Sequence, residues 1–451
     1  MNQRSPLESI SPVDGRYAGQ TRELGNYFSE LALFKYRIKV EIEYFIALCA
    51  SGAGKLQPLS VSQCEGLRNL YVDFSLSEAL KVKSLEKQTN HDIKAVEYYI
   101  KDAFSEHFPE LEKEYVHFGL TSQDINNTAI PLSLKEGYQL VIKPAIDQVI
   151  FRLNQLADEW QKVPMLARTH GQPASPTSIG KEIRVFCERL EIQVNLAEST
   201  VWAAKFGGAT GNLNAHRVAF PQTNWVAFAN DFVASLGLHR SKTTTQIEHY
   251  DQLAAFFHNM IRVSTILIDL SRDIWSYISI EYFRQKVVEG ETGSSAMPHK
   301  VNPIDFENAE GNLGVAIAIM EHFAVKLPIS RMQRDLTDST VLRNIGVPLA
   351  HMLISLKSIT KGLNKLNLNE EAIRVDLDKH ASVVAEAIQT ILRRESYPQP
   401  YEALKAFTRG KGSLSMEDIR SFIDSLDISD TLRLELHQVK PENYTGYSFE
   451  M

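Results

Sequence analysis

Apolar residues recur at intervals of three and four along most of this 451-residue chain, a spacing typical of amphipathic α-helices. In the segment HDIKAVEYYIKDAF, residues 91–104, they fall on one helical face: Ile93, Val96, Ile100 and Phe104. Thr89 and Asn90 precede this segment as candidate N-caps. The pattern therefore predicts an amphipathic helix with a polar start.

Several helices are predicted to be much longer than the globular average of about 11 residues. The segment from Gln246 to about Glu289 keeps the helical spacing without a proline. Similar patterns cover residues 131–160, 178–206 and 312–366, the last broken near Pro328. Helices of this length need partners of equal length, so we expect a bundle. The many apolar positions indicate burial within an assembly of several subunits.

Sheet is expected to be scarce, because alternation of apolar and polar residues between turn signals is nearly absent. One short hairpin is predicted at residues 206–220, where FGGATGNLNAH is rich in turn formers. This glycine cluster lacks the Gly-Lys-Ser/Thr ending of a phosphate-binding loop, which favours a turn over a nucleotide site.

The helical period is interrupted near residues 107–115 and again near residues 364–370. We therefore predict three domains in an all-α chain. They are an N-terminal helical domain, a central domain with the bundle of long helices, and a C-terminal helical cap: residues 1–111, 112–364 and 365–451.

Composition narrows the class of protein. Hydrophobic residues make up 44% and charged residues 23% of the chain, as in globular proteins. A formal net charge of −7 gives no basic footprint for nucleic acid or for an anionic membrane. No signal peptide and no run of roughly 20 apolar residues is present, so a cytoplasmic protein is expected.

The side chains that bind metals or form disulfides are sparse. Cys49, Cys64 and Cys187 are odd in number and widely spaced, which favours reduced thiols over disulfides or a zinc site. None of the 13 histidines forms an HExxH or HxH cluster. We expect neither a metal nor another cofactor.

The segment GSSAMPHKVNP, residues 293–303, is a small basic loop in a chain of helices. Asn302 and Pro303 are typical of an N-cap and a first helical residue, which places Glu307 about one turn inside a helix. The helix start offers free amide donors and partial positive charge, and Lys300 adds a full charge. The loop is therefore a candidate anion site.

Two hydroxyl groups in this loop carry a further hypothesis. Ser294 and Ser295 follow Gly293, a hinge that would let them fold over an anionic ligand. A serine becomes a useful base only where a cation and amide donors stabilise its alkoxide, and Lys300 and the backbone provide both. The alternative is an exposed linker between two helices.

Three further segments gather polar side chains. His170 lies among glycine and proline in RTHGQPASP, residues 168–176, where it would present a ring nitrogen to a ligand or simply bond the backbone. TNHDIK, residues 89–94, and TSQDIN, residues 121–126, each place hydroxyl and amide groups at a helix start. Binding of phosphate or carboxylate and ordinary capping both remain open there.

The segment SRMQRDLTDSTVLRN, residues 330–344, combines three arginines with two hydroxyl groups: Arg331, Arg334, Arg343, Ser339 and Thr340. Such groups suit a phosphate or a dicarboxylate. The alternative is a solvated turn in which Asp335 and Asp338 pair with the arginines.

Taken in order, these segments resemble the fumarase/aspartase superfamily, and within it the adenylosuccinate lyase family. MPHK followed by IDFENAEGN resembles that branch, whereas fumarases and aspartases typically read MPGK and argininosuccinate lyases MPQK. The resemblance begins at SPVDGRY, residues 11–17, and continues through TNHDIKAVEYY, TSQDINN, RTHGQPASP, TTQIE and RDLTDSTVLRN. It therefore covers most of the chain, and TSQDINN is similar to the longer bacterial type.

The resemblance implies an almost all-helical, three-domain subunit that forms a homotetramer with active sites shared among subunits. It also implies a reaction of purine nucleotide biosynthesis, the β-elimination of fumarate. The substrates would be adenylosuccinate, which gives AMP, and the succinylated aminoimidazole carboxamide ribotide. Small molecules and further copies of the chain would be the only partners.

The same resemblance implies residue roles. Ser294 matches the catalytic base, His170 the acid and Glu307 the carboxylate that pairs with the acid, while Lys300 and Asn302 match the groups that hold the substrate carboxylate. Other positions match groups that bind the nucleotide and the succinyl moiety: Arg16, Tyr17, Asn90, His91, Asp92, Thr121, Ser122, Gln246, Ser295, Asn308, Arg334, Ser339, Thr340 and Arg343.

Two alternatives remain at this level. One is another lyase of the superfamily, such as an argininosuccinate lyase or a fumarase. The other is a structural protein that kept the fold without catalysis, as lens crystallins of this superfamily did. The complete chemical set of Ser294, His170, Glu307 and Lys300 favours an active enzyme.

Overall fold

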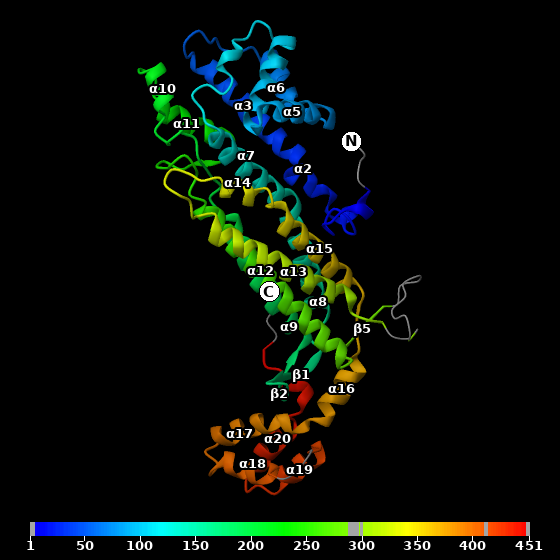
Figure 1. Cartoon of the computed structure of the whole chain (residues 1–451). Coiled ribbons are helices and arrows are strands. Elements are labelled where there is room, and N and C mark those ends of the chain that lie inside the picture. The colour runs from blue at the N-terminus through cyan, green and yellow to red at the C-terminus, as the bar shows by residue number, and fades with distance from the viewer. Residues whose placement is uncertain (1–4, 287–296, 298–300, 410–413, 448–451) are drawn as a thin grey trace. The chain divides into compact units, whose positions relative to one another are not determined.

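The structure is a computed structural model, and it describes residues 5–286, 297, 301–409 and 414–447. Helices dominate it (Figure 1), so the all-α prediction is confirmed. The first eleven helices are α1 (Ala18–Thr21), α2 (Gly25–Phe28), α3 (Glu30–Ser51), α4 (Val61–Val72), α5 (Leu76–Thr89), α6 (Asp92–His107), α7 (Ser122–Gly137), α8 (Lys143–Glu159), α9 (Ile179–Glu198), α10 (Asn214–Ala219) and α11 (Trp225–Ser235).

The remaining helices are α12 (Asp251–Ser279), α13 (Ile304–Lys326), α14 (Thr337–Leu342), α15 (Gly346–Asn364), α16 (Glu370–Lys379), α17 (Ala385–Arg394), α18 (Pro400–Thr408), α19 (Met416–Asp424) and α20 (Asp430–His437). A π-helical turn, Tyr138–Ile142, joins α7 to α8. Short 3₁₀ turns occur at Pro6–Glu8, Arg22–Leu24, Lys113–Tyr115, Ala381–Val384 and Pro441–Asn443.

Contacts divide the chain into two compact units, each assembled from three stretches of sequence. Unit 1 comprises residues 1–146, 193–265 and 311–357, and unit 2 comprises residues 147–192, 266–310 and 358–451. Helices α8, α9, α12, α13 and α15 contribute residues to both units. The three sequence-based domains, with boundaries at 111 and 364, stay a prediction.

The long helices agree with the apolar pattern except at some ends. Helix α12 covers most of the predicted 246–289 segment, but it stops at Ser279 because Glu281 adopts a left-handed φ of 65°. The predicted break near Pro328 is confirmed, since α13 ends at Lys326. By composition α12 is also long enough to cross a membrane, but 56% of its most apolar window is buried inside the protein, as in a core helix.

A proline lies inside α7 rather than at its start. Pro131 has no backbone N–H, so the carbonyl of Asn127, four residues earlier, loses its helical donor. The backbone N–H of Lys205 donates to this carbonyl at 3.4 Å instead. The proline thus leaves a carbonyl group of α7 available, and the segment after α9 forms a hydrogen bond with it.

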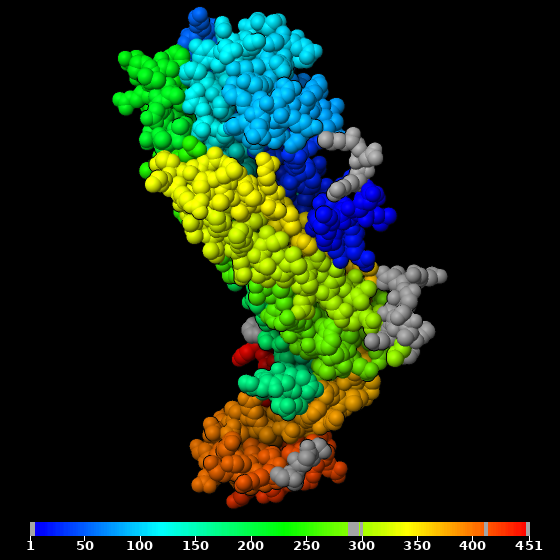
Figure 2. Space-filling model, viewed as in Figure 1, coloured from blue at the N-terminus to red at the C-terminus, as the bar shows by residue number. Residues whose placement is uncertain are grey.

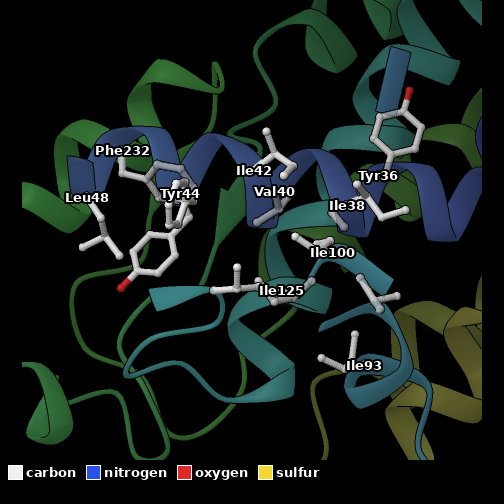
Figure 3. Close-up of a cluster of buried hydrophobic side chains, with 14 of the residues drawn as sticks. Tyr36, Ile38, Val40, Ile42, Tyr44, Leu48, Ile93, Ile100, Ile125 and Phe232 are labelled. Carbon is white, nitrogen blue, oxygen red and sulfur yellow. The ribbon is translucent and has the colours of Figure 1, made fainter. Parts of the chain in front are cut away.

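The core of unit 1 forms around α3. Figure 3 shows side chains of α3, among them Ile38, Val40 and Tyr44, packed with Ile93 and Ile100 of α6, Ile125 of α7 and Phe232 of α11. The predicted face of α6 is confirmed, since its four apolar residues are at most 1% exposed: Ile93, Val96, Ile100 and Phe104.

The predicted caps of α6 were wrong. Thr89 is the last residue of α5, and Asn90 ends that helix with a left-handed φ of 49°. Asparagine tolerates this conformation better than most residues, which explains why it serves as a C-cap here. The N-cap is His91, whose Nδ1 accepts a hydrogen bond from the backbone N–H of Lys94 at 3.1 Å.

The predicted hairpin was also misplaced. Residues 206–220 form turns and α10, because the amides of Gly207 and Gly208 donate to the buried carboxylate of Asp124 instead of to a partner strand. The antiparallel hairpin consists of β1 (Pro164–Thr169) and β2 (Gln172–Ser178). Its three prolines argue against a strand, but they are tolerated because each strand has only one neighbour.

Two further pairs of short strands occur: β3 (Ala203–Ala204) with β4 (His239–Arg240), and β5 (Phe283–Gln285) with β6 (Leu366–Leu368). The C-terminal helices α17 to α20 of unit 2 enclose a second apolar cluster that includes Ile388, Leu392 and Leu436, and Figure 2 shows them in orange to red. All three cysteines are free thiols, as predicted, and burial raises the pKa of Cys49 to about 11.

Candidate active site

The structure places His170 at the tip of the β1–β2 hairpin. Thr169 pairs with Gln172, so His170 and Gly171 form a two-residue turn with φ values of 54° and 74°. Two residues of positive φ match the twist of a hairpin, which is why X-Gly sequences favour such turns. The imidazole is exposed. The turn therefore exposes the side chain of His170 to solvent at the end of the hairpin.

Ion pairing fixes the base of this hairpin. Arg168 bonds Asp376 of α16 at 2.6 Å, and the hydroxyl of Tyr282 donates to the same carboxylate at 2.5 Å. Burial alone would raise the pKa of Asp376, but the hydrogen bonds from Tyr282 and Arg168 outweigh it and hold that pKa below its usual value. The turn with His170 is thus exposed, while ion pairing and hydrogen bonding to Asp376 hold the hairpin strands in place.

The helix after the basic loop begins close to its predicted start. Helix α13 starts at Ile304, and the carbonyl of Pro303 accepts the backbone N–H of Glu307 at 3.3 Å. The N-cap is therefore Pro303, one residue later than predicted. Glu307 lies in the first turn, as expected. Ser294, Ser295 and Lys300 lie outside the described residues, while Asn302 is half-buried just before the helix.

Within unit 2, Glu307 has a neighbour other than His170. Its Oε1 accepts the indole N–H of Trp275 on α12 at 3.1 Å. Asn308, the next residue, donates to the hydroxyl of Ser358 at 2.8 Å. No hydrogen bond joins Glu307 to His170 among the residues described for unit 2, so their pairing stays a prediction.

In unit 1, Asp92 is bonded to two arginines. Its Oδ2 accepts from Arg37 at 2.7 Å and from Arg343 at 3.1 Å, and its Oδ1 accepts the backbone N–H of Ile93. Burial alone would raise the pKa of Asp92, but the charge of Arg37 and its hydrogen bond outweigh it and lower that pKa. The structure therefore joins two predicted binding residues that are 251 positions apart.

The arginine-rich segment is partly neutralised. Arg334 donates to Ser339 at 3.0 Å and lies 3.8 Å from Asp338, while Arg331 lies 3.5 Å from Asp335. The two arginine–aspartate pairs considered as an alternative are thus present. With its amide in the orientation that satisfies both atoms, Gln123 also accepts from Arg334.

The other predicted residues of unit 1 lie at helix ends and turns. Thr121 is the N-cap of α7, its backbone N–H donating to Asp124 at 2.8 Å, and Ser122 is the first helical residue. Gln246 donates to the carbonyl of Ala209 at 3.1 Å. Asn90 is exposed, as are His91, Thr340 and Arg16, and the guanidinium of Arg16 lies 6.0 Å from the ring centre of Tyr17.

Two cavities in unit 1 meet at Arg343. One of about 300 Å³ is lined by Arg37, Asn126, Ser339 and Arg343, among others. The second, of about 770 Å³, extends from Arg343 to the turn at residues 11–14 and the start of α1. Together they place polar groups and a cation beside enough space for a small molecule.

Sequence reasoning missed the buried network below these residues. Lys205 and Asp124, both fully buried, bond at 2.8 Å, and Gly207 and Gly208 donate to the same carboxylate. Tyr250 donates to Asp338 at 2.9 Å and accepts from Asn127 at 2.7 Å. A signal existed for the first pair, since Asp124 occupies the third helical position after Thr121, where a carboxylate completes a capping box.

Within the described ranges, no group of three or more histidine, cysteine, aspartate or glutamate side chains is placed to hold a metal ion. The chemistry available in these ranges is that of arginine, histidine, carboxylate and hydroxyl groups, which suits an anionic substrate and proton transfer.

The chain is similar to known lyases along nearly its whole length. Residues 15–318 match the family model described as "Lyase", and residues 330–445 match "Adenylosuccinate lyase C-terminal". The chain is 58% identical to an adenylosuccinate lyase of Dictyostelium discoideum, across 98% of this chain and 97% of that protein. It is 45% identical to an adenylosuccinate lyase of Escherichia coli strain K12, across 99% and 98%.

Solved structures agree at the level of the fold. A 3-carboxy-cis,cis-muconate lactonizing enzyme from Pseudomonas putida superposes with a TM-score of 0.73, covering 95% of this chain and 94% of that one. Its sequence is 19% identical, so the likeness concerns the arrangement of the helices and carries no argument about substrate.

Proposed function

The chain belongs to the adenylosuccinate lyase family, and from that premise we propose how its own residues bind a succinylated nucleotide and eliminate fumarate from it. It is a lyase of the fumarase/aspartase superfamily. The observation that carries the proposal is identity of 44 to 58% over nearly the whole length of curated adenylosuccinate lyases. The substrates are adenylosuccinate and the succinylated aminoimidazole carboxamide ribotide.

The difficult step is removal of a weakly acidic proton from the succinyl carbon beside a carboxylate. Ser294, as an alkoxide, takes this proton, and the released electron pair forms the carbon–carbon double bond of fumarate as the carbon–nitrogen bond breaks. His170 donates a proton to the departing nitrogen. Ser294 then loses the proton it gained and His170 regains one, which returns the enzyme to its starting state.

Charge stabilisation accompanies this proton transfer. Negative charge grows on the succinyl carboxylate as the proton leaves, and Lys300 and Asn302 bind that carboxylate most strongly at this stage. Ser295 and Asn308 bind the succinyl group, and Glu307 orients the acid histidine. The exposed position of His170 on a locked hairpin supports the role of a proton donor to a bound ligand.

The nucleotide is bound by unit 1 in this proposal. The arginines and hydroxyl groups that line or adjoin the two cavities hold its anionic group, and residues near the starts of α6 and α7 bind the rest of the nucleotide. The full proposed set is Arg16, Tyr17, Asn90, His91, Asp92, Thr121, Ser122, Gln246, Arg334, Ser339, Thr340 and Arg343. The charge of Arg343 beside 300 and 770 Å³ cavities supports this placement.

The working form is a cytoplasmic homotetramer whose subunits share active sites. Long helices with exposed apolar side chains support association, since monomers rarely expose such faces. Helix α9 exposes Ile192 by 56% and Leu196 by 49%, and α13 exposes Val315 by 46%. A symmetric assembly would bury these residues.

A substrate panel tests the proposed reaction. Purified full-length chain is given adenylosuccinate, argininosuccinate or malate, and fumarate release is followed by ultraviolet absorbance and chromatography. We expect release from adenylosuccinate alone, with equimolar AMP. Release from argininosuccinate and not from adenylosuccinate would assign the chain to another lyase of the superfamily, and no release from any of them would support a structural role.

A further inference from the structure

Arg37 is a buried charge that belongs to none of the recognised motifs. It lies in the middle of α3, within the apolar core of unit 1, and only 3% of its surface is exposed. Its Nε donates to Asn126 at 2.9 Å and its Nη2 donates to Asp92 at 2.7 Å. A buried charge is costly unless it is paired. Among the described residues, Asp92 is its only ion-pair partner within 4.0 Å.

The same oxygen of Asp92, Oδ2, accepts a hydrogen bond from Arg37 and another from Arg343. The three side chains therefore carry two positive charges and one negative charge, a net charge of +1. The two arginines differ in exposure: the side chain of Arg37 is 4% exposed and that of Arg343 is 47% exposed. The surplus positive charge is thus available to water and to a ligand at Arg343, the more exposed of the two arginines.

Removal of Arg37 would change this balance. Asp92 and Arg343 would then form a simple neutral pair, and the carboxylate would compete with a substrate anion for the same guanidinium. With Arg37 present, Asp92 is neutralised from the buried side and serves to orient Arg343. Both arginines line the 300 Å³ cavity, so the effect acts where the ligand is expected.

We propose that Arg37 is a positioning residue for the lyase reaction: it neutralises Asp92 from within the core, so that Asp92 orients Arg343 without cancelling its charge toward the anionic substrate. This inference rests on the proposed function of Arg343 in substrate binding. Arg37 lies on α3, outside every segment that carries the family resemblance, and would contribute to the affinity for the substrate.

A double-mutant cycle separates this role from a purely structural one. The variants are Arg37→Met, Arg343→Ala and the double variant, each as the assembled full-length enzyme, with kcat and KM measured for adenylosuccinate. We expect Arg37→Met to raise KM about tenfold while kcat changes less than about threefold, since the lost interaction is equal in the ground and transition states. In the Arg343→Ala background the same substitution should change KM by less than about twofold.

Conservative variants test the charge itself. Arg37→Lys keeps a cation beside Asp92, and we expect its KM to stay within about threefold of the parent. Arg37→Gln keeps a donor without the charge and should behave like Arg37→Met. Arg68→Met removes an arginine from a surface pair with Glu43 elsewhere in unit 1 and serves as the matched control, with KM unchanged.

The outcomes distinguish the two proposals. A KM increase of equal size with and without Arg343, or equal KM values for Arg37→Lys and Arg37→Gln, would overturn the role of Arg37. An unchanged KM in Arg343→Ala would instead count against Arg343 as a substrate ligand and so against the proposed function. If Arg37→Met does not assemble, the comparison of lysine with glutamine decides alone.

Discussion

Buried charges impose the strongest constraints on single residues of this chain. Lys205 and Asp124 are both 0% exposed, and desolvation by burial lowers the pKa of Lys205 despite its partner. Removing one partner of such a pair typically costs about 3–5 kcal/mol, because the other charge is left buried and unpaired. These residues therefore stabilise the segments that carry the predicted binding groups.

A second buried pair makes stability depend on pH. Nδ1 of His117 lies 2.5 Å from Oε1 of Glu41, which is 1% exposed. Burial alone would lower the pKa of His117, but the charge and hydrogen bond of Glu41 outweigh it, with smaller contributions from Glu97 and Asp124, and the pKa is raised. A raised histidine pKa stabilises the fold below the unfolded value of about 6.5, and this stabilisation is lost as pH rises through the folded value.

We therefore predict that the free energy of unfolding of the wild type falls, relative to that of His117→Gln, through the pH range that begins at about 6.5 and ends above the raised pKa of His117. Equilibrium urea unfolding across this range at fixed protein concentration measures it. His239→Gln, which alters an exposed histidine of the same unit, should keep the pH dependence of the wild type. An identical pH dependence in His117→Gln would show that the pair contributes nothing to the native state in this range.

At the scale of elements, close backbone contacts decide where helices are allowed to pack. An added Cβ at Gly180, near the start of α9, would lie 2.3 Å from the carbonyl oxygen of Ala157 on α8 and 2.6 Å from Cα of Gln161. Both atoms belong to the backbone, so a small side-chain movement cannot relieve the clash. Glycine is thus required for α8 and α9 to approach as closely as they do.

The corresponding prediction concerns stability. Gly180→Ala should lower the free energy of unfolding by at least about 2 kcal/mol, since overpacking against backbone forces the helices apart. Gly19→Ala is the matched control, because a Cβ there meets no atom within 4 Å, and it should change stability by less than about 0.5 kcal/mol. Urea unfolding compares the two, and equal stabilities would mean that α8 and α9 adjust freely.

For the whole molecule, the proposed homotetramer raises the question of whether each active site takes residues from more than one subunit. His170 is exposed, and Glu307 bonds Trp275 within its own unit. This arrangement agrees with a site in which the acid and its partners come from different copies of the chain. A chain with one defect would then compensate for a chain with another.

We predict that Ser294→Ala and His170→Ala each lower kcat by at least about a hundredfold, the usual contribution of a general base or acid. After the two variants are mixed, dissociated and reassembled, about one quarter of the sites should contain both intact residues if these come from different subunits. Fumarate release by the mixture, compared with each parent, measures this recovery. Native mass spectrometry, with one of the two variants isotopically labelled, checks that mixed tetramers have formed.

Two results would contradict the prediction. Near-normal turnover by Ser294→Ala would remove that residue as the base. Activity of correctly assembled mixed tetramers no higher than that of the parents would mean that Ser294 and His170 act within one subunit, and the shared site would have to be abandoned.

Much of the fold could be predicted from the sequence, because helix formation depends on neighbours three and four residues away. The buried face of α6, the long α12 and the break after α13 all follow from this local spacing. The hairpin at residues 164–178 could not, since its prolines disfavour strands and only the pairing of two segments offsets them.

For the candidate site, too, some features follow from the sequence and others only from the tertiary structure. The order of the motifs, the presence of His170 and Glu307 and membership of a lyase family were determined by the sequence alone, since residue identity and local spacing carry that information. Tertiary structure decided that His91 and not Asn90 caps α6, that Asp92 meets Arg343, and that Arg37 lies beneath them. The two arginine–aspartate pairs join residues 55 and 251 positions apart, and local sequence spacing cannot specify which distant residues meet when the chain packs.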